Sequence, residues 1–424
     1  MIKLCLFFAC AAPALLAADP QPSVADYPSI QEALDANPGK VIYVPAGDYL
    51  IHEQIRVSHD GTGLCGPGRI IQDNPDQAII RMKHDRGGVL RDLTLTRAEG
   101  RQDSPKEGVM IMQCPEAVVD NVKVIDNRTQ ATVIYARQSD GVRLSHCLVR
   151  NYMRLNVEDR TADKDWGYAF NSIDGTGIAI VETTGALVEG CRVIEEVMVP
   201  TPEIQAKYKL GTFVKKNPEK GVIVNQKMWD ANYTDAWHQG SGIVINSPTT
   251  TDAIRVLGNH VENAAQGLDI HADHVIISQN IIKNAFIGMK AMHGSRNVLI
   301  TGNQFIKNDL WAIGLMPGAA STETNTDGGT IVSGNIISDF GEGQAHWIWG
   351  DGRSPIKFDD GQKPGNPPLT DVIIQGNLIQ SLGAPHYRYA VIIPKGPNAP
   401  RGLHFMGNLF PPGTSGVANI ELPQ

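Results

Sequence analysis

Positive charge is scarce in this chain of 424 residues. It has 37 Lys and Arg against 45 Asp and Glu, a net charge of −8, and no basic tract. Aromatic residues are also few, at 6 % of the composition. Nucleic-acid binding, which needs clustered basic and aromatic side chains, is therefore disfavoured. If the ligand is an anionic polymer, local Lys and Arg side chains in a groove must attract it.

Long apolar runs are missing after the first 18 residues, so we predict no membrane span in the mature chain. Within the first 18, Lys3 precedes an apolar run over 4–16, and Ala17-Ala18 offers a small-residue cleavage point. This pattern predicts a signal peptide over 1–18 and a secreted or periplasmic protein. Lipidation of Cys10 is the alternative, but the residues before it make a poor lipobox.

Cysteine is scarce too, with six in all, two of them in the predicted signal. The remaining four lack the close spacings of a zinc site; they are Cys65, Cys114, Cys147 and Cys191. The last two occupy equivalent positions of neighbouring repeats, about 4.8 Å apart if the repeats stack. They are either two buried thiols or a disulfide.

Short β-type runs recur along the chain and are clearest between residues 241 and 317. Three runs begin with glycine (242–246, 267–271 and 288–292), and each is followed by a second run that ends in Asn259, Asn280 or Asn303. Such regular recurrence indicates a solenoid, in which each repeat buries its apolar face only against its neighbours. We predict one domain over 19–424 with about ten rungs.

The start of the chain and its asparagines carry a resemblance to a known fold. Residues 26–36 predict a capping helix with Ser29 as N-cap, and Gly39-Lys-Val-Ile-Tyr-Val-Pro-Ala-Gly-Asp-Tyr49 follows. This entrance resembles that of the pectate-lyase-like, single-stranded right-handed parallel β-helix proteins. The resemblance implies an all-β right-handed parallel β-helix with an internal asparagine ladder. The ladder column is predicted as Asp92, Asn121, Cys147, Cys191, Asn259, Asn280, Asn303, Asn335, Asn377 and Asn408.

Four insertions interrupt the period, at about 151–175, 197–240, 318–328 and 351–368. The first two fall before the first strand of the next rung and the last two fall after a first strand. We therefore expect them to wall a groove along the outer face of the first-strand sheet, because long loops on a rigid scaffold commonly carry function.

Polar residues gather on three neighbouring rungs of that face. Alternation within a strand predicts that Asn246, Asp269, His271 and Lys290 point outward together. The outward pairs of other rungs are predicted to be mostly apolar, among them Ile134/Ala136 and Ala179/Val181. A plain Asp269–Lys290 salt bridge is the structural alternative to a site.

This cluster suits removal of the C5 proton of a uronate, which needs a proton-transfer group and a cation beside the substrate carboxylate. His271 can transfer the proton, and Lys290 can neutralise the carboxylate or act as base. Asp269 can orient the imidazole. The predicted catalytic residues are Asp269, His271 and Lys290, and the predicted substrate-binding residues are Asn246, His238, Tyr233, Asp235, Trp237 and His293.

A second resemblance concerns the same residues. Gly267-Leu-Asp-Ile-His-Ala-Asp273 resembles the Asp-Pro-His signature of alginate C5-epimerases, with Ile270 in place of the proline. It implies catalytic roles for Asp269 and His271, with Lys290 as the basic neutraliser. A lysine on this face also resembles β-helix alginate and chondroitin lyases, whose base is a lysine. We therefore predict an enzyme that acts on an acidic polysaccharide or oligosaccharide, a lyase or an epimerase.

Two other function classes and one cofactor stay open. A glycoside hydrolase needs two carboxylates about 5–10 Å apart; the candidates are Asp174, Glu182, Asp230, Asp235 and Asp269, whereas the pair Asp359-Asp360 lies in a late insertion. A non-catalytic carbohydrate-binding β-helix is the third class. Calcium is a possible cofactor, with oxygen ligands from Asp159, Asp163 and Asp165. No other metal is predicted.

Overall fold

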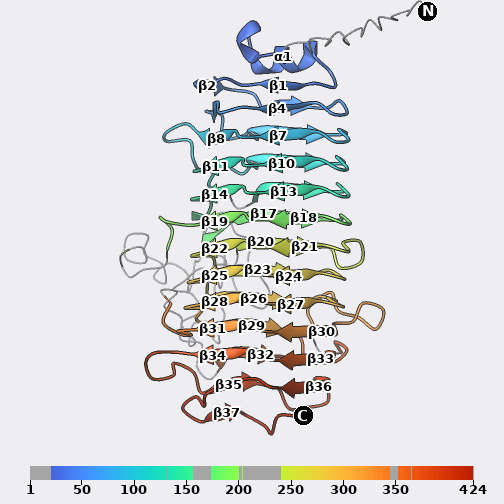
Figure 1. Cartoon of the computed structure of the whole chain (residues 1–424), viewed down its shortest axis with the longest axis vertical. Coiled ribbons are helices and arrows are strands. Elements are labelled where there is room, and N and C mark those ends of the chain that lie inside the picture. Colours follow the sequence, from blue (N-terminus) through green and yellow to red (C-terminus); the bar gives the residue numbers. More distant parts are fainter. Residues whose placement is uncertain are drawn as a thin grey trace, which may run out of the picture.

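The computed structural model describes residues 21–129, 131–155, 173–199, 203, 240–343, 352–363 and 365–423. The chain coils through three parallel sheets, A, B and C, which run the length of the molecule (Figure 1). Each strand pairs with the strand three places along in the same sheet in most rungs, for example β23 with β26. The predicted fold class, a right-handed parallel β-helix with an N-terminal capping helix, is confirmed.

The strands of each sheet stack in chain order. Sheet A has 12 strands: β1 (Val41–Tyr43), β4 (Gly63–Cys65), β7 (Val89–Arg91), β10 (Val118–Asp120), β13 (Arg143–Ser145), β18 (Leu187–Glu189), β21 (Arg255–Leu257), β24 (Ile276–Ser278), β27 (Leu299–Thr301), β30 (Gly328–Ser333), β33 (Thr370–Gln375) and β36 (Arg401–Met406). Sheet B has 11: β2 (Asp48–Ile51), β5 (Arg69–Gln72), β8 (Thr94–Arg97), β11 (Lys123–Ile125), β14 (Leu148–Arg150), β19 (Arg192–Ile194), β22 (His260–Glu262), β25 (Ile281–Lys283), β28 (Gln304–Ile306), β31 (Ile336–Ser338) and β34 (Leu378–Gln380).

Sheet C, the first-strand sheet of the sequence repeats, has 12 strands: β3 (Ile55–Val57), β6 (Ile80–Lys83), β9 (Val109–Met112), β12 (Thr132–Arg137), β17 (Thr176–Val181), β20 (Ser241–Asn246), β23 (Gln266–Ile270), β26 (Ile287–Ala291), β29 (Trp311–Leu315), β32 (Ser354–Phe358), β35 (Tyr389–Ile392) and β37 (Gly416–Ala418). The helices η1 (Val24–Asp26) and α1 (Ile30–Ala36) precede the sheets, and β15 (Arg154–Leu155) pairs antiparallel with β16 (Ile173–Asp174). Among the described residues no helix is long and apolar enough to cross a bilayer.

The core is a set of apolar columns inside the coil. In sheet A, for example, Leu144, Val188, Val256, Ile277 and Ile300 stack in register and are fully buried. Each rung thus buries its apolar residues between the rungs before and after it, as a solenoid requires. Stacking also leaves the first and last rungs with open strand edges.

The capping helix closes the N-terminal edge. Ser29 is the N-cap of α1, its side chain accepting from the Glu32 N–H, and the predicted apolar stripe is buried. The side-chain amide of Gln31 bonds both backbone groups of Arg56 in β3, at 3.2 and 2.8 Å. A helix side chain thereby replaces the strand that sheet C lacks at this end.

The asparagine ladder is confirmed in the second half of the chain and wrong at its first two members. From Asn259 to Asn408 each side-chain oxygen accepts from the preceding rung, at 2.9 to 3.0 Å. Asp92 and Asn121 instead lie one residue earlier, in the exposed left-handed turn position (φ 63° and 51°) that Gly258 fills further along. Leu93 and Val122 take the buried position.

Cys147 and Cys191 occupy the ladder as buried free thiols rather than a disulfide. The Cys191 N–H donates to the side-chain oxygen of Asn259, so the column continues from thiols into amides. The remaining two, Cys65 and Cys114, are also buried and free.

Among the described residues 12 strands stack in sheets A and C and 11 in sheet B, close to the prediction of about ten rungs. One missed strand matters for function, because β32 forms from 354–358, inside the predicted insertion at 351–368. The insertion therefore begins after Phe358. The insertion at 318–328 lies between β29 and β30, as predicted.

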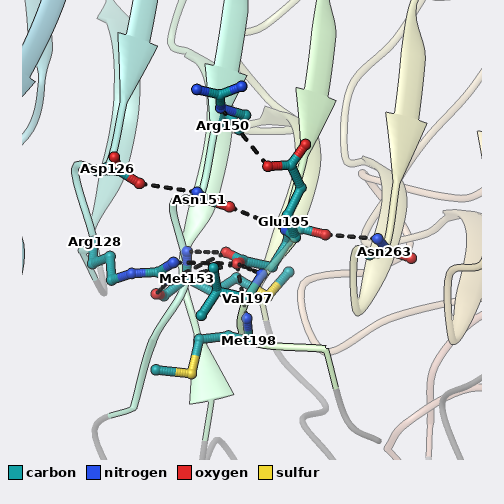
Figure 2. Close-up of polar contacts among 10 residues, drawn as sticks. Asp126, Arg128, Arg150, Asn151, Met153, Glu195, Val197, Met198 and Asn263 are labelled. Carbon is teal, nitrogen blue, oxygen red and sulfur yellow. Dashed lines mark hydrogen bonds and ion pairs between the residues drawn. The ribbon is translucent and has the colours of Figure 1, made fainter.

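A buried carboxylate holds the starting segments of the two longest insertions (Figure 2). Glu195 is fully buried and accepts from the backbone N–H groups of Met153, Val197 and Met198, all at 2.9 Å. The guanidinium of Arg128 lies 3.4 Å from it and donates to the carbonyl of Met153. The chain thus enters both insertions from one charged anchor, because Met153 lies in the first and Val197 begins the second.

Candidate functional site

The register of sheet C determines which side chains share its outer face. Val244, Asp269, Lys290, Gly314 and Lys357 are consecutive partners across β20, β23, β26, β29 and β32. Figure 1 shows these strands stacked in the middle and lower part of the coil. The predicted neighbours Asp269 and Lys290 are therefore directly opposite each other, as the sequence repeats indicate.

One rung was assigned to the wrong face. Tyr135 pairs with Met110 and Ala179, and Arg137 pairs with Met112 and Val181, so these two side chains share the outer face. Ile134 and Ala136, predicted to point outward, are fully buried in the core. Polarity on the outer face consequently extends beyond three rungs, and Arg137 forms a two-pronged ion pair with Glu182, at 2.9 and 2.7 Å.

Asp269 is the centre of the predicted catalytic cluster. Its Oδ1 lies 2.7 Å from Nε2 of His271, and its Oδ2 lies 3.5 Å from Nζ of Lys290. The angles at the first contact depart from those of a regular hydrogen bond, so it is best described as a close ion-pair contact. The side chains of Asp269, His271 and Lys290 are 10, 13 and 12 % exposed. The three predicted catalytic residues thus meet in one sheltered patch.

The charges around Asp269 decide its protonation. Burial by itself would raise the pKa of this carboxyl, but His271 and Lys290 together outweigh burial and hold the pKa below its usual range. Asp269 is therefore a carboxylate at any working pH near neutral. An anion fixed between an imidazole and an ammonium can orient both groups toward a substrate.

Asn246 holds the other side of the His271 ring. Its Oδ1 accepts from the Ser247 N–H at 2.7 Å and lies 3.2 Å from Nδ1 of His271. Both ring nitrogens of His271 thus contact oxygen atoms. When the ring carries two protons it can donate one from each nitrogen, and a substrate oxygen that replaces Asn246 would meet the Nδ1 proton.

His293, predicted to bind substrate, packs edge-on against His271 with ring centroids 4.4 Å apart. Its Nδ1 accepts from the Ala320 N–H at 3.2 Å, which leaves the proton on Nε2. Burial and the nearby charges of His271 and Lys290 lower the pKa of His293 to about 3. His293 is therefore a neutral hydrogen-bond donor near neutral pH and a poor base.

The insertion at 318–328 is tied to this histidine. A side chain at Gly318 would collide with the His293 ring, since a Cβ there lies 2.2 Å from Nδ1. Asn325 donates to the carbonyl of His293 at 2.8 Å. Asp327 accepts from the N–H groups of Gly294 and Ser295 at 2.8 and 3.0 Å. These bonds place the insertion against the cluster, and its role as a wall of a groove stays a prediction.

Several predicted residues lie outside the described part of the chain. They are His238, Tyr233, Asp235, Trp237, Asp230, Asp159, Asp163 and Asp165. Their roles in substrate, carboxylate or calcium binding stay predictions. Among the described residues, no group of three or more His, Cys, Asp and Glu side chains is arranged to hold a metal ion.

Two of the carboxylates considered for hydrolysis already have partners in the fold. Glu182 is committed to Arg137, and Asp174 lies on β16 and accepts from the N–H of Gly175. Asp359 directly follows β32, three rungs beyond Asp269. Three strand spacings are about 14 Å along the axis, beyond the separation expected for a hydrolytic pair.

Sequence reasoning missed two residues on this face, Trp311 and Lys357. Both lie beyond Lys290, on β29 and β32. The alternation in Ser354-Pro-Ile-Lys-Phe358 is a strand signal that could have revealed Lys357, but the proline and the long gap between Asn335 and Asn377 obscured it. A shallow hollow of about 480 Å³ lies elsewhere, lined by residues of sheet A and its turns such as Ser333 and Gln375.

Comparison with solved structures places the fold among carbohydrate-active enzymes. DFA-IIIase from Arthrobacter chlorophenolicus A6, solved in complex with GF2, aligns with a TM-score of 0.60 at 12 % identity, over 95 % of this chain and 98 % of that one. The Agl-KA catalytic domain gives 0.53 at 12 % identity, over 97 % and 70 %. The alginate lyase AlyF-OU02, in complex with G6, gives 0.52 at 10 % identity, over 97 % and 90 %.

These neighbours are hydrolases as well as lyases, since GH87 α-1,3-glucanases and a PL6 alginate lyase also align. At such identities the likeness shows the fold alone. The sequence matches no protein-family model, and no curated protein matches it. The alignments with solved structures confirm the resemblance to parallel β-helix proteins.

Proposed function

We propose that this protein is a carbohydrate-active enzyme that cleaves or epimerises an acidic polysaccharide by proton transfer at C5 of a uronate. The observation that carries the proposal is the contact of Asp269 with both His271 and Lys290 on one sheltered outer face. Parallel β-helix neighbours that include alginate lyases support it. The predicted signal peptide adds that the enzyme acts outside the cytoplasm.

The residues divide the work by their chemistry. Lys290 supplies a fixed positive charge to the uronate carboxylate, which stabilises the enolate-like charge that develops when C5 loses its proton. Asp269 orients the ring of His271. His271 transfers the proton, because imidazole is the side chain that exchanges protons near neutral pH. In β-elimination the C5–H and C4–O4 bonds break, a C4–C5 double bond forms, and the leaving oxygen gains a proton.

Glycoside hydrolysis is the alternative, and one observation favours it. Burial raises the pKa of Asp359, and the adjacent Asp360 adds to this effect. A carboxyl whose pKa is raised is better suited to act as a general acid than one with an ordinary pKa. Hydrolase neighbours share the fold. In this case Asp359, rather than His271, would be essential.

The test is a screen of purified uronic-acid polymers with the full chain. We expect the ultraviolet absorbance of an unsaturated uronate to rise with time, or, for an epimerase, exchange of the C5 hydrogen with solvent. His271→Ala and Lys290→Ala should each lower the rate at least about 100-fold, the range for a lost proton-transfer group.

Matched controls come from ion pairs of the same type elsewhere. His274 pairs with Asp252 at 2.6 Å and is 60 % exposed, and Lys283 pairs with Glu262 at 2.7 Å on sheet B. His274→Ala and Lys283→Ala should retain activity. New reducing ends without absorbance, abolished by Asp359→Asn, would establish hydrolysis. Binding without turnover of any polymer would contradict both enzyme proposals and favour a carbohydrate-binding protein.

A further inference from the structure

The outer face of sheet C holds a second cationic position beyond the proposed catalytic cluster. Lys357 on β32 lies in the same column as Lys290 on β26, with Gly314 of β29 between them. The two lysines are therefore about 10 Å apart along the axis. Lys357 has a partly sheltered side chain, 15 % exposed, and its Nζ lies 3.7 Å from Asp359, too far for a hydrogen bond. Its ammonium can therefore turn to another anion.

An aromatic ring lies between the two lysines. A Cβ on Gly314 would point to the same side as Lys290 and Lys357, and it would lie 3.1 Å from Cε3 of Trp311. The indole ring consequently lies on the outer face, against the bare backbone of Gly314. Trp311 is partly exposed, and its N–H donates to the carbonyl of Gly352 at 3.1 Å, which fixes the ring.

We propose that Trp311 and Lys357 form a sugar subsite next to the catalytic cluster, in which the indole stacks on a pyranose ring and the ammonium binds a uronate carboxylate. Sugar rings present apolar C–H faces that pack on aromatic rings. The subsite rests on the proposed function and extends it, since it requires a polyuronate that runs along the coil axis over β26, β29 and β32.

The order of positions defines the register of the substrate. A pyranose unit is about as long as one strand spacing. The two strand spacings between Lys290 and Lys357 therefore correspond to two sugar units along the chain. A carboxylate at Lys290 and a second at Lys357 would then belong to uronates separated by one sugar, which lies over Trp311. A uronate dimer is too short to reach both lysines, whereas longer oligomers reach both.

Binding measurements by calorimetry test the subsite independently of turnover. The probes are a uronate dimer, a longer oligouronate and a neutral glucan oligomer of the same length. We expect Lys357→Gln to weaken binding of the longer oligouronate about tenfold, the effect of losing one charge-assisted bond, and to leave the dimer unchanged. Lys123→Gln, at an exposed position of β11 on sheet B, is the control and should change neither.

Trp311 provides a second readout. Trp311→Phe keeps a stacking ring and should retain most of the affinity for the longer oligouronate. Trp311→Ala should weaken this affinity about tenfold. Oligouronate should also change the tryptophan fluorescence of the wild type more than that of Trp311→Phe. Equal affinity of Lys357→Gln and Lys123→Gln for the longer oligomer would overturn the subsite, and so would a wild type that binds no oligouronate.

The subsite and the proposed function fail in different ways. A wild type that binds the longer oligouronate through Lys357 but neither cleaves nor epimerises it would support the subsite and refute the catalytic proposal. If the wild type turns over polyuronates, and Lys357→Gln and Trp311→Ala change neither this turnover nor oligouronate binding, the proposed function stands and the subsite is refuted.

Discussion

At the scale of single residues, burial of charge is the clearest feature of this molecule. Asp269 is buried beside His271 and Lys290 and its pKa falls, whereas Asp85 is buried with no Lys or Arg ion pair among the described residues and its pKa rises to about 7. Neither carboxyl oxygen of Asp85 has a hydrogen-bond partner of normal geometry among the described residues. The same side chain therefore serves as a stable anion at one position and as a strained acid at another.

Asp85 should make the protein less stable as the pH rises. Its folded pKa is raised above the unfolded value, so its ionisation destabilises the fold as pH rises from about 4 to about 7. Asp85 occupies the rung position that Ser139 and Thr183 fill further along. We expect Asp85→Ser to raise the free energy of unfolding by about 1–3 kcal/mol at pH 8.

Thermal unfolding of both proteins at two pH values measures this effect. The stabilisation should shrink to a small part of its pH 8 value near pH 4, where Asp85 is protonated in the folded state and about half protonated in the unfolded state. Asp76→Ser, at an exposed carboxylate that does not act on Asp85, is the control and should show no such pH dependence. An equal change in melting temperature at both pH values would contradict the assignment.

At the scale of elements, the ladder supplies the bonds that the bends of the coil would otherwise lack. Asn280 is fully buried, donates to the carbonyl of Val256 and to Asn303, and accepts from the N–H of Asn259. Each of these groups would be left unpaired by a smaller side chain. An unpaired buried polar group costs about 1–3 kcal/mol.

Asn280→Ala should therefore lower the free energy of unfolding by about 3 kcal/mol. Asn408→Ala, at the half-buried end of the same ladder, should cost less, because water can reach the groups it releases. Urea titration followed by circular dichroism compares the two. Equal losses would indicate that the ladder contributes through packing rather than through its hydrogen bonds.

The elements also show how far sequence patterns lead. The helix α1, its Ser29 cap and the ladder from Asn259 onward follow from local signals and were predicted. The misplacement of Ile134 and Ala136 arose because the strand β12 has no glycine or asparagine that marks its phase. Shifting a strand by one residue exchanges its two faces. Pairing with β9 and β17, which only the structure shows, corrects the phase.

At the scale of the whole molecule, the coil is a stack whose open edge must be covered. At the N-terminus α1 buries Leu34, 2 % exposed, against the first rung, while Ala36 on the same helix is exposed. The cap contributes no strand, and it protects both the apolar core and the free edge of β3.

Leu34→Asp should undock this cap, because an unpaired charge at a buried position is strongly unfavourable. We expect concentration-dependent association through the exposed first rung, measured by light scattering. Ala36→Asp adds the same charge at an exposed position of α1 and should leave the protein monodisperse to the same degree as the wild type. Association of both variants would show that charge alone, not loss of the cap, is responsible.

The sequence by itself determined the kind of fold and the nearest neighbours within it: repeated apolar runs can bury themselves only by stacking, and stacking brings Asp269 opposite Lys290. Only the tertiary structure showed which residues far apart in the sequence lie next to each other. The packing of 318–328 against His293, and the alignment of Lys357 with Lys290 across β29, depend on how insertions and an unmarked strand return to the coil. Local sequence patterns do not show where an insertion rejoins the coil. The lengths of the insertions are irregular, and the contacts that each one makes determine where it ends.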